Sequence, residues 1–516
     1  MSERKNWDAI TIGSGLGSLS AAAALANQGK QVLVLERLAN FGGAATVYRH
    51  GNLTMEASLH ETDGDTVFNP DGVFQRLGLS DTVDPIETDI FYEVRGGPLA
   101  EPIRVPHGLT KAALALQTAL PDDAPALESY FDELRQLYLG TSELEAMGSR
   151  GPSVLLSLLF SGQLFAMIGN VRRTISDRFD AMFHSSEAPK FALGAVLPYF
   201  DNDPEVMSYF AYAAIYARYV ETGSYSFRGG SQALTRALMK RIRAAEGEAR
   251  HNVTVKNILL DSDGAACGVA YENSNGDMFE VHAPIIFGGT APQTLAAMLP
   301  EEQSADFAER YAKNEPSISL FSLSLGLNRP AEDFGVSAYS TFIYPERMTR
   351  YCDYAEAAKA FAGDPEAVPP YIVADYGRLN TGLAKPGDLH HVTLAGVDKL
   401  EWWADLDEAS EMARRKNWID FLITDLNRHY PGIADAIAHS EIATARTMHN
   451  RLGTPGGEVY GFRPTVSRLF GSRPNAQTAI KGLWLSSAYT VSGGYSGAMH
   501  GGLMAADAAL RAERKD

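Results

Sequence analysis

Glycines near the N-terminus have the types and spacing of a phosphate-binding turn. Gly13 and Gly15 are the first two glycines of a Gly-x-Gly-x-x-Gly pattern, and Ser18, which is also small, stands in place of the third. In such a turn the first glycine allows a sharp bend, and the second lets the backbone approach a pyrophosphate. Glu36, after the next apolar run, falls where a carboxylate accepts hydrogen bonds from ribose hydroxyls. The spacing predicts a bound dinucleotide; an ordinary glycine turn is the alternative.

The elements around this turn are those that a dinucleotide site needs. Residues 7–12 predict a strand, the alanine-rich run that follows the turn predicts a helix ending near Gly29, and residues 31–35 predict a second strand. This βαβ unit points the free N–H groups and the positive dipole end of its helix at the phosphates. A second glycine turn follows, with Gly42 and Gly43 among small residues that suit a backbone lying against a large buried ligand. That second turn favours FAD over NAD.

The C-terminal end of the chain carries another glycine cluster. Residues 481–489 predict a short strand, residues 493–502 are rich in glycine, and a helix is predicted from Leu503 to about Ala512. Small residues before a helix N-terminus suit a phosphate or the pyrimidine edge of a flavin, because the helix dipole stabilises negative charge that develops on reduction. A plain packing joint between loop and helix is the alternative. The predicted cofactor-binding residues are Gly13, Ser14, Gly15, Gly17, Ser18, Glu36, Arg37, Gly42, Gly43, Ala44, Gly494, Tyr495, Ser496 and Gly497.

Four stretches spread over nearly the whole chain carry a family resemblance. They are residues 12–17 with Gly42-Gly43, residues 225–231, residues 283–292 and the C-terminal glycine cluster. In these stretches the chain resembles the FAD-dependent oxidoreductases that include bacterial phytoene desaturases, carotenoid isomerases and retinol saturases. The resemblance implies an α/β fold in which a Rossmann-like, FAD-binding domain of the amine-oxidase-like flavoproteins is interleaved with an α+β substrate domain.

Two further stretches are similar to the saturase and isomerase branch of that family. They are residues 56–60 and residues 453–455, with Tyr460-Gly461 close behind. The first departs from the pattern, since Ala57-Ser58 stand where a hydrophobic residue and a glycine are expected.

The motifs divide the chain into five alternating segments. We expect the FAD-binding domain to be built from residues 1–110, 223–290 and 441–516, and the substrate domain from residues 111–222, mainly helical, and 291–440.

Composition excludes several classes of protein. The 516 residues carry a net charge of −18 and show no basic stripe, so nucleic acid is not expected as a partner. Cys267 and Cys352 are isolated, so the sequence predicts no metal site, no disulfide framework and no cysteinyl-flavin bond. The N-terminus shows no apolar targeting segment, so a cytoplasmic location is expected. The sequence makes no prediction about the oligomeric state.

Two apolar regions bear on the substrate. Residues 152–169 carry no charge and are followed by Arg172 and Arg173, but the run is shorter than the roughly 20 residues of a membrane-spanning helix. We expect a helix that lines a substrate channel or dips into a membrane surface, with peripheral association; a buried core helix is the alternative. An aromatic cluster follows, which suits either a core or the walls of a polyene tunnel. Its members are Tyr199, Phe200, Tyr209, Phe210, Tyr212, Tyr216 and Tyr219.

The candidate catalytic residues are His60, His500 and Tyr489. His60 follows a strand-like segment leading out of the flavin-binding region and matches a histidine of the saturase-like branch, which implies an acid or base role; a structural histidine is the alternative. His500 lies within the C-terminal glycine cluster, and Tyr489 and Tyr495 are candidates for walling one face of a flavin ring. Glu61 and Asp63 either orient His60 or are solvated.

The predicted function is that of an FAD-dependent oxidoreductase or isomerase acting on C=C bonds of a long hydrophobic, carotenoid- or retinoid-like substrate, by desaturation, saturation or cis–trans isomerisation. A fatty-acid double-bond isomerase and an amine oxidase are alternatives on the same fold. A non-catalytic isoprenoid-binding protein is the alternative from another class.

Overall fold

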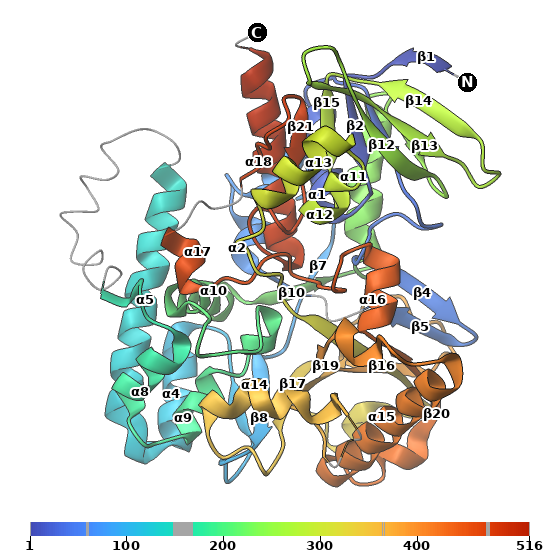
Figure 1. Cartoon of the computed structure of the whole chain (residues 1–516). Helices are drawn as coiled ribbons and strands as arrows, with labels where there is room; N and C mark the ends of the chain where they lie inside the picture. The colour runs from blue at the N-terminus through green and yellow to red at the C-terminus, as the bar shows by residue number, and fades with distance from the viewer. Residues whose placement is uncertain are drawn as a thin grey trace.

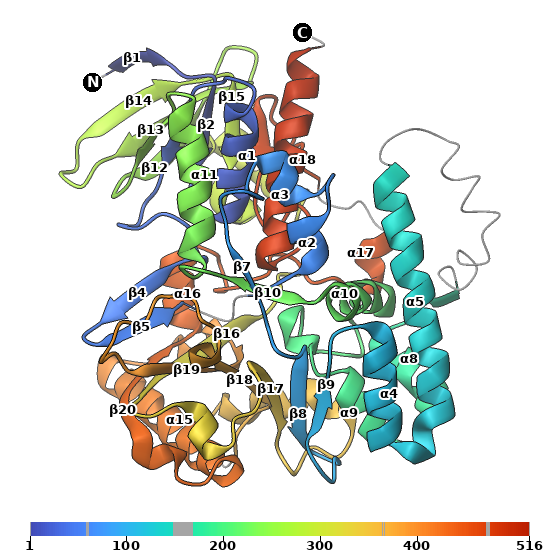
Figure 2. The same cartoon turned by 180° about the vertical axis from the view of Figure 1, so that it is seen from behind.

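The computed structural model describes residues 2–57, 61–147, 169–363, 365, 367–470 and 475–514. Its upper part holds a parallel sheet covered on both faces, and its lower part holds a large mixed sheet beside a group of helices (Figure 1). Both described ends of the chain lie in the upper part. The view from behind shows β7 and β10 running through the centre, between the two parts (Figure 2).

The parallel sheet has the strand order β11-β3-β2-β15-β21, and all its neighbouring strands run parallel. Residues of β2, β3, β15 and β21 are all buried, as expected where both faces of a parallel sheet are covered. The strands are β2 (Ala9–Ile12), β3 (Val32–Leu35), β11 (Glu248–Arg250), β15 (Ile285–Gly288) and β21 (Leu483–Leu485). The predicted Rossmann-like fold is thereby confirmed.

Alternate residues of these strands face two different cores. Val32 and Val34 pack with the helices α1 (Leu16–Ala26), α11 (Gln232–Ala244) and α18 (Gly494–Glu513). Leu33 and Leu35 pack against an antiparallel layer and two short helices. That layer comprises β12 (Thr254–Leu260), β13 (Ala266–Glu272) and β14 (Met278–His282), with β1 (Ser2–Asn6) paired to β14, and the helices are α12 (Pro292–Ala296) and α13 (Glu301–Glu309).

Helices from the two ends of the chain meet at glycines. A Cβ on Gly502 of α18 would lie 2.0 Å from the carbonyl oxygen of Gly17 in α1, so no larger residue fits at this crossing. The close approach also explains a difference from the sequence prediction. The helix was expected from Leu503, but α18 begins at Gly494, because the glycines of the cluster form its first turns and let it pack against α1.

The large sheet has the order β20-β16-β19-β18-β17-β8-β9. Neighbours are antiparallel except β17 and β8, which are parallel. The strands are β8 (Tyr92–Gly96), β9 (Ile103–Val105), β16 (Ser319–Leu327), β17 (Ser340–Tyr344), β18 (Tyr371–Asp375), β19 (His390–Asp398) and β20 (Ile437–Ala443). β8 and β9 lie within residues 1–110, which the sequence assigned to the FAD-binding domain, yet they extend this sheet.

Helices cover the large sheet and fill the space beside it. Helix α15 (Glu408–His429) packs Trp418, Leu422 and Leu426 against β16 and β19. A separate aromatic-rich core joins the sheet to the helices α4 (Leu109–Ala119), α5 (Ala124–Met147), α8 (Ile175–Phe183), α9 (Ala188–Leu193) and α10 (Tyr209–Thr222). Tyr212 and Tyr216 are fully buried there, which favours the core interpretation for these two members of the aromatic cluster.

Short elements connect these bodies. The central sheet β6-β10-β7 is formed by β6 (Thr62–Asp63), β7 (Pro85–Glu87) and β10 (Ser224–Phe227), and β4 (Val47–His50) pairs with β5 (Leu53–Glu56) as a hairpin. The remaining helices are α2 (Gly64–Phe68), α3 (Val73–Leu77), α14 (Tyr354–Ala357), α16 (Ala445–Leu452) and α17 (Val466–Phe470).

The apolar run at residues 152–169 lies outside the described residues, apart from Gly169. Among the helices that the structure describes, none is long and apolar enough to cross a membrane.

Candidate functional site

The turn between β2 and α1 has the conformation of a phosphate-binding turn. Gly13 has a φ of 88°, which favours glycine, and its N–H donates to the carbonyl of Leu35 at 2.8 Å. Gly15 is the N-cap residue of α1, and no side chain in the described part of the chain caps this helix. The first N–H groups of α1 are therefore available to an anion.

Gly15 provides a test of whether this turn fits a ligand. Its φ of −59° and ψ of 160° are open to any residue. Among the described residues, no atom beyond its chain neighbours lies within 4 Å of the position that a Cβ on Gly15 would take. By contrast, a Cβ on Gly17 would lie 2.3 Å from the carbonyl oxygen of Ser486. The protein itself thus needs glycine at position 17 but not at position 15, and the open space above Gly15 fits a pyrophosphate.

Glu36 ties the two glycine turns together. Its Oε2 accepts from the N–H and the hydroxyl of Ser14 at 2.9 and 2.6 Å, and its Oε1 accepts from the N–H of Leu38 at 2.7 Å. The Ser14 hydroxyl oxygen accepts from the N–H of Gly42 at 3.1 Å, and Gly42 is bridged to Gly15. A carboxylate offers about four acceptor positions, so Glu36 retains capacity for a ribose hydroxyl.

Two predicted cofactor residues make protein contacts. The Arg37 guanidinium donates to the carbonyls of Asn450 and Arg451 at 2.8 and 2.9 Å, near the end of α16. The Ser18 hydroxyl oxygen lies 3.3 Å from the Ser486 hydroxyl oxygen. A Cβ on Gly289 would lie 2.0 Å from the same Ser18 oxygen. Ser18 therefore fills the place of the third glycine by packing α1 against the end of β15. Ala44 lies in the second turn, beside Gly43.

The N-terminus of α18 lies between the two parts of the molecule (Figure 1). Gly493 is its N-cap residue, and no described side chain caps it. The hydroxyl of Ser496 accepts from Thr66 at 2.8 Å. A Cβ on Gly497 would lie 2.1 Å from the Ser492 hydroxyl, so this turn is tightly folded. Tyr495 is buried against the α1 and α11 core.

The candidate catalytic residues differ in how the structure places them. His60 lies outside the described residues. Nδ1 of His500 lies 3.0 Å from the Ser496 carbonyl oxygen, one turn earlier in α18. The Tyr489 hydroxyl donates to the buried carboxylate of Glu458, and its ring meets Phe462 edge to face at 4.9 Å. Tyr489 is thus held firmly near the end of β21.

Glu61, which the sequence analysis considered only as a neighbour of His60, has a buried carboxyl group. Both its carboxylate oxygens are buried, and among the described residues neither has a hydrogen-bond partner of good geometry. Burial raises the pKa of Glu61 to about 7, and the hydroxyls of Tyr199 and Ser224 oppose this rise only in part. The solvated alternative for Glu61 is therefore wrong.

Aromatic side chains surround Glu61 and connect it to α18. The Tyr219 hydroxyl donates to the Glu61 carbonyl at 3.4 Å. Burial raises the pKa of Tyr199, Tyr219 and Tyr460, and the negative charge of Glu61 adds to each rise. The Cα of Tyr460 lies 2.5 Å from the position that a Cβ on Gly493 would take. Tyr460 therefore packs directly against the N-cap of α18.

Asp63 has a structural role instead. Its carboxylate accepts from the N–H and the hydroxyl of Thr66 at 2.9 and 2.8 Å, which caps α2. It is buried, so the solvated alternative does not hold for Asp63 either.

Sequence reasoning also missed two buried groups between the parts of the molecule. Glu56 accepts from the N–H and hydroxyl of Ser231 at 2.8 and 2.6 Å, so it anchors the hairpin to the start of α11. His391 stacks on Tyr376 at 5.0 Å, and burial lowers its pKa to about 4, so it is neutral at physiological pH. Glu56 is the first residue of the stretch 56–60 that resembles the saturase and isomerase branch, so that resemblance could have pointed to it. No sequence pattern distinguishes His391 from other histidines.

The raised pKa of Glu61 predicts a pH-dependent effect of Glu61→Gln on stability. The folded protein favours the protonated acid, so the stability that the proton contributes is fully present below the ordinary pKa of 4.5 and is lost as the pH rises through about 7. Glutamine removes this dependence. We expect the variant to be more stable than wild type by up to about 3 kcal/mol at about pH 8.5, and by less than about 1 kcal/mol at about pH 5.

Urea unfolding of both proteins at the two pH values measures this difference. Asp375 and Asp398 also have pKa values raised by burial to about 7. Both are present in both proteins, so they do not contribute to the difference. A variant that is equally or less stable at the higher pH contradicts the assignment.

Comparisons with known proteins agree with this geometry. Residues 11–70 match the NAD(P)-binding Rossmann-like domain family. All-trans-retinol 13,14-reductase of Danio rerio is 22% identical over 97% of this chain and 85% of its own length. Chloroplastic prolycopene isomerase of Daucus carota is 22% identical over 93% of this chain and 76% of its own length. The neurosporene-forming phytoene desaturase of Rhodobacter capsulatus is 23% identical over 93% of this chain and 90% of its own length.

Among solved structures, an oxidoreductase from Methanosarcina mazei superposes with a TM-score of 0.61 at 15% identity, covering 98% of this chain and 99% of its own. That likeness supports the fold. The relatives confirm the resemblance predicted from the sequence, to the group of phytoene desaturases, carotenoid isomerases and retinol saturases, and they confirm that the chain is an oxidoreductase-type enzyme.

Proposed function

We propose that this chain binds FAD and acts on a C=C bond of a long hydrophobic polyene of the retinoid or carotenoid class. The open space above Gly15, next to the anchored carboxylate of Glu36, is the observation that carries the proposal. The three relatives are named for retinol, prolycopene and phytoene, and this chain matches each over at least 93% of its length. Reduction, desaturation and cis–trans isomerisation are all compatible with the site.

Each part of the proposed cofactor has residues suited to hold it. The N–H groups at Gly15 and the start of α1 would hold the pyrophosphate, and Glu36 would accept a hydrogen bond from the ribose. The N–H groups at Gly494 to Gly497 would hold the pyrimidine edge, and the dipole of α18 would stabilise negative charge there. A bound flavin supplies the acceptor or donor of a hydride.

The surroundings of Glu61 fit an apolar substrate. A polyene offers no polar groups for recognition, so its site needs aromatic or aliphatic walls and few hydrogen-bonding groups. Tyr199, Tyr219 and Tyr460 supply aromatic surface around a carboxyl group that can hold or release a proton near neutral pH. We propose Glu61 as the acid or base of the reaction, with His60 next to it in the chain as a second candidate. We propose that Tyr489 and His500 contact the flavin or the substrate.

We expect the purified protein to hold FAD tightly and without a covalent bond. Cys267 lies on β13, and the Cys352 thiol accepts from Arg350, so neither cysteine belongs to a glycine turn. Acid precipitation should release the yellow chromophore into the supernatant, where its absorption spectrum and mass identify it. Colour that stays in the pellet contradicts non-covalent binding, and a colourless protein that cannot be reconstituted with FAD favours the non-catalytic isoprenoid-binding alternative.

A further inference from the structure

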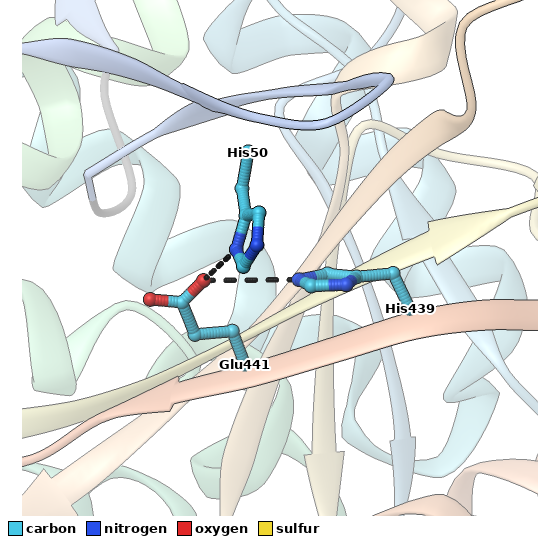
Figure 3. A group of neighbouring side chains, drawn as sticks. All are labelled: His50, His439 and Glu441. Atoms are coloured by element: carbon cyan, nitrogen blue, oxygen red, sulfur yellow. Dashed lines mark hydrogen bonds and ion pairs between the residues drawn. The ribbon is translucent and has the colours of Figure 1, made fainter.

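A cluster of potential metal ligands lies on the outer rim of the molecule. His50 stands at the end of β4, and His439 and Glu441 lie two residues apart on β20, so they share one face of this edge strand (Figure 3). The three side chains point toward a common centre. None of them contributes to the site described above.

Their distances suit a small divalent cation. Nδ1 of His50 lies 3.3 Å and Nε2 of His439 lies 3.7 Å from Oε2 of Glu441, and all three ligand atoms lie within 4.8 Å of one another. Tetrahedral zinc with bonds of about 2.0 to 2.1 Å places its ligand atoms about 3.3 Å apart. Two of the three separations are thus within a few tenths of an ångström of that value. A modest rotation of the exposed His50 ring can close the third.

The His439 ring has a nitrogen that is free to coordinate a cation. Its Nε2 atom is buried and, within the described part of the chain, has no hydrogen-bond partner. A buried ring nitrogen without a partner is unfavourable, and coordination of a cation satisfies it. The remaining approach to the cluster is open, since the side chain of His50 is 66% exposed, so water can complete the coordination sphere.

The hairpin that carries His50 is held in place on both sides of its turn. Arg49 donates to both carboxylate oxygens of Asp388 at 2.8 and 2.6 Å, and the N–H of Leu389 donates to the Asn52 carbonyl at 2.9 Å. His50 therefore faces β20 without a metal. The same ion pair neutralises Arg49, which would otherwise repel a cation at its neighbour.

We propose that His50, His439 and Glu441 bind one divalent transition-metal ion per chain, with Zn²⁺ as the best match to two imidazoles and one carboxylate. The ion joins the β4–β5 hairpin to the edge of the large sheet. The β4–β5 hairpin precedes Glu61 in the chain, so the ion ties the region before this proposed acid or base to the large sheet. This inference does not depend on the proposed function.

Zinc binding to the full-length holoprotein, prepared without a histidine tag and stripped with a chelator, tests the proposal. Equilibrium dialysis against Zn²⁺ should give one bound ion per chain. His50→Ala, His439→Ala and Glu441→Gln should each lose that ion at the same free zinc concentration. His282→Ala, which removes another exposed histidine on β14, serves as the matched control and should keep it.

A second measurement distinguishes a specific site from weak surface binding. Zn²⁺ should raise the thermal midpoint of the wild type and of His282→Ala, but not that of His439→Ala, because a ligand that binds only the folded state stabilises it. Absence of a bound ion in the wild type overturns the proposal. So does an ion that persists in all three ligand variants.

Discussion

Replacing Gly15 with alanine is expected to remove the bound flavin and leave the folded protein intact. The backbone at position 15 accepts any residue, and among the described residues nothing lies within 4 Å of the added Cβ. Only a ligand in the turn meets the new methyl group. Flavin content per chain should fall by at least about tenfold, which corresponds to about 1.4 kcal/mol of lost binding.

Two matched variants make this result specific. Gly363→Ala adds a methyl group at another glycine with an open Cβ position, and its flavin content should be unchanged. Gly17→Ala places a Cβ 2.3 Å from the Ser486 carbonyl oxygen, so it should damage folding and flavin binding together. Flavin absorbance per chain and the thermal midpoint of each apoprotein are the two readouts. A Gly15→Ala protein with full flavin content contradicts the placement of the pyrophosphate.

The second large effect concerns turnover. Glu61→Gln keeps the size and polarity of the side chain but removes its ability to exchange a proton. A positioned acid or base contributes about 10²- to 10⁴-fold in rate, so turnover should fall within that range while flavin content stays constant. The pH profile should also change: the wild-type limb near the pKa of about 7 should be absent in the variant.

Asp398→Asn is the matched control for this experiment. Asp398 is also buried with a pKa raised to about 7, but it bonds to Trp403 and to the N–H of Ala445 in the core beneath α15. Its replacement should affect stability and leave the pH profile of turnover unchanged. A loss of less than about tenfold in Glu61→Gln rejects the role of Glu61. If His60→Ala then shows the larger loss, the proton-transfer role belongs to His60.

Local patterns made the nucleotide-binding half of the fold predictable. The glycine spacing at 13 and 15, the apolar strand 31–35 and Glu36 lie within one short segment, so their contacts follow from sequence order. The start of α18 at Gly494 was not predictable in this way. Glycine disfavours helix in isolation, and only the close contact between Gly502 and Gly17 at the other end of the chain makes it suitable there.

Contacts between distant segments account for what the sequence did not reveal. The parallel pairing of β8 with β17 joins residues near 94 to residues near 342, and no local signal reports it. The surroundings of Glu61 depend likewise on a distant segment, since Tyr219, which donates to the Glu61 carbonyl, lies 158 residues further along the chain. His50 and Glu441 are 391 residues apart, so their meeting required the fold.

The central claim is most directly tested by anaerobic incubation of the oxidised and the reduced holoenzyme with a panel of retinoids, carotenoids, unsaturated fatty acids and amines, followed by chromatographic product analysis. A polyene should be converted, with a changed number or geometry of its conjugated double bonds, and Glu61→Gln should slow this conversion. The redox state that supports conversion identifies desaturation, reduction or isomerisation. A holoenzyme that converts only an amine or a fatty acid, or that converts nothing in either redox state, contradicts the account.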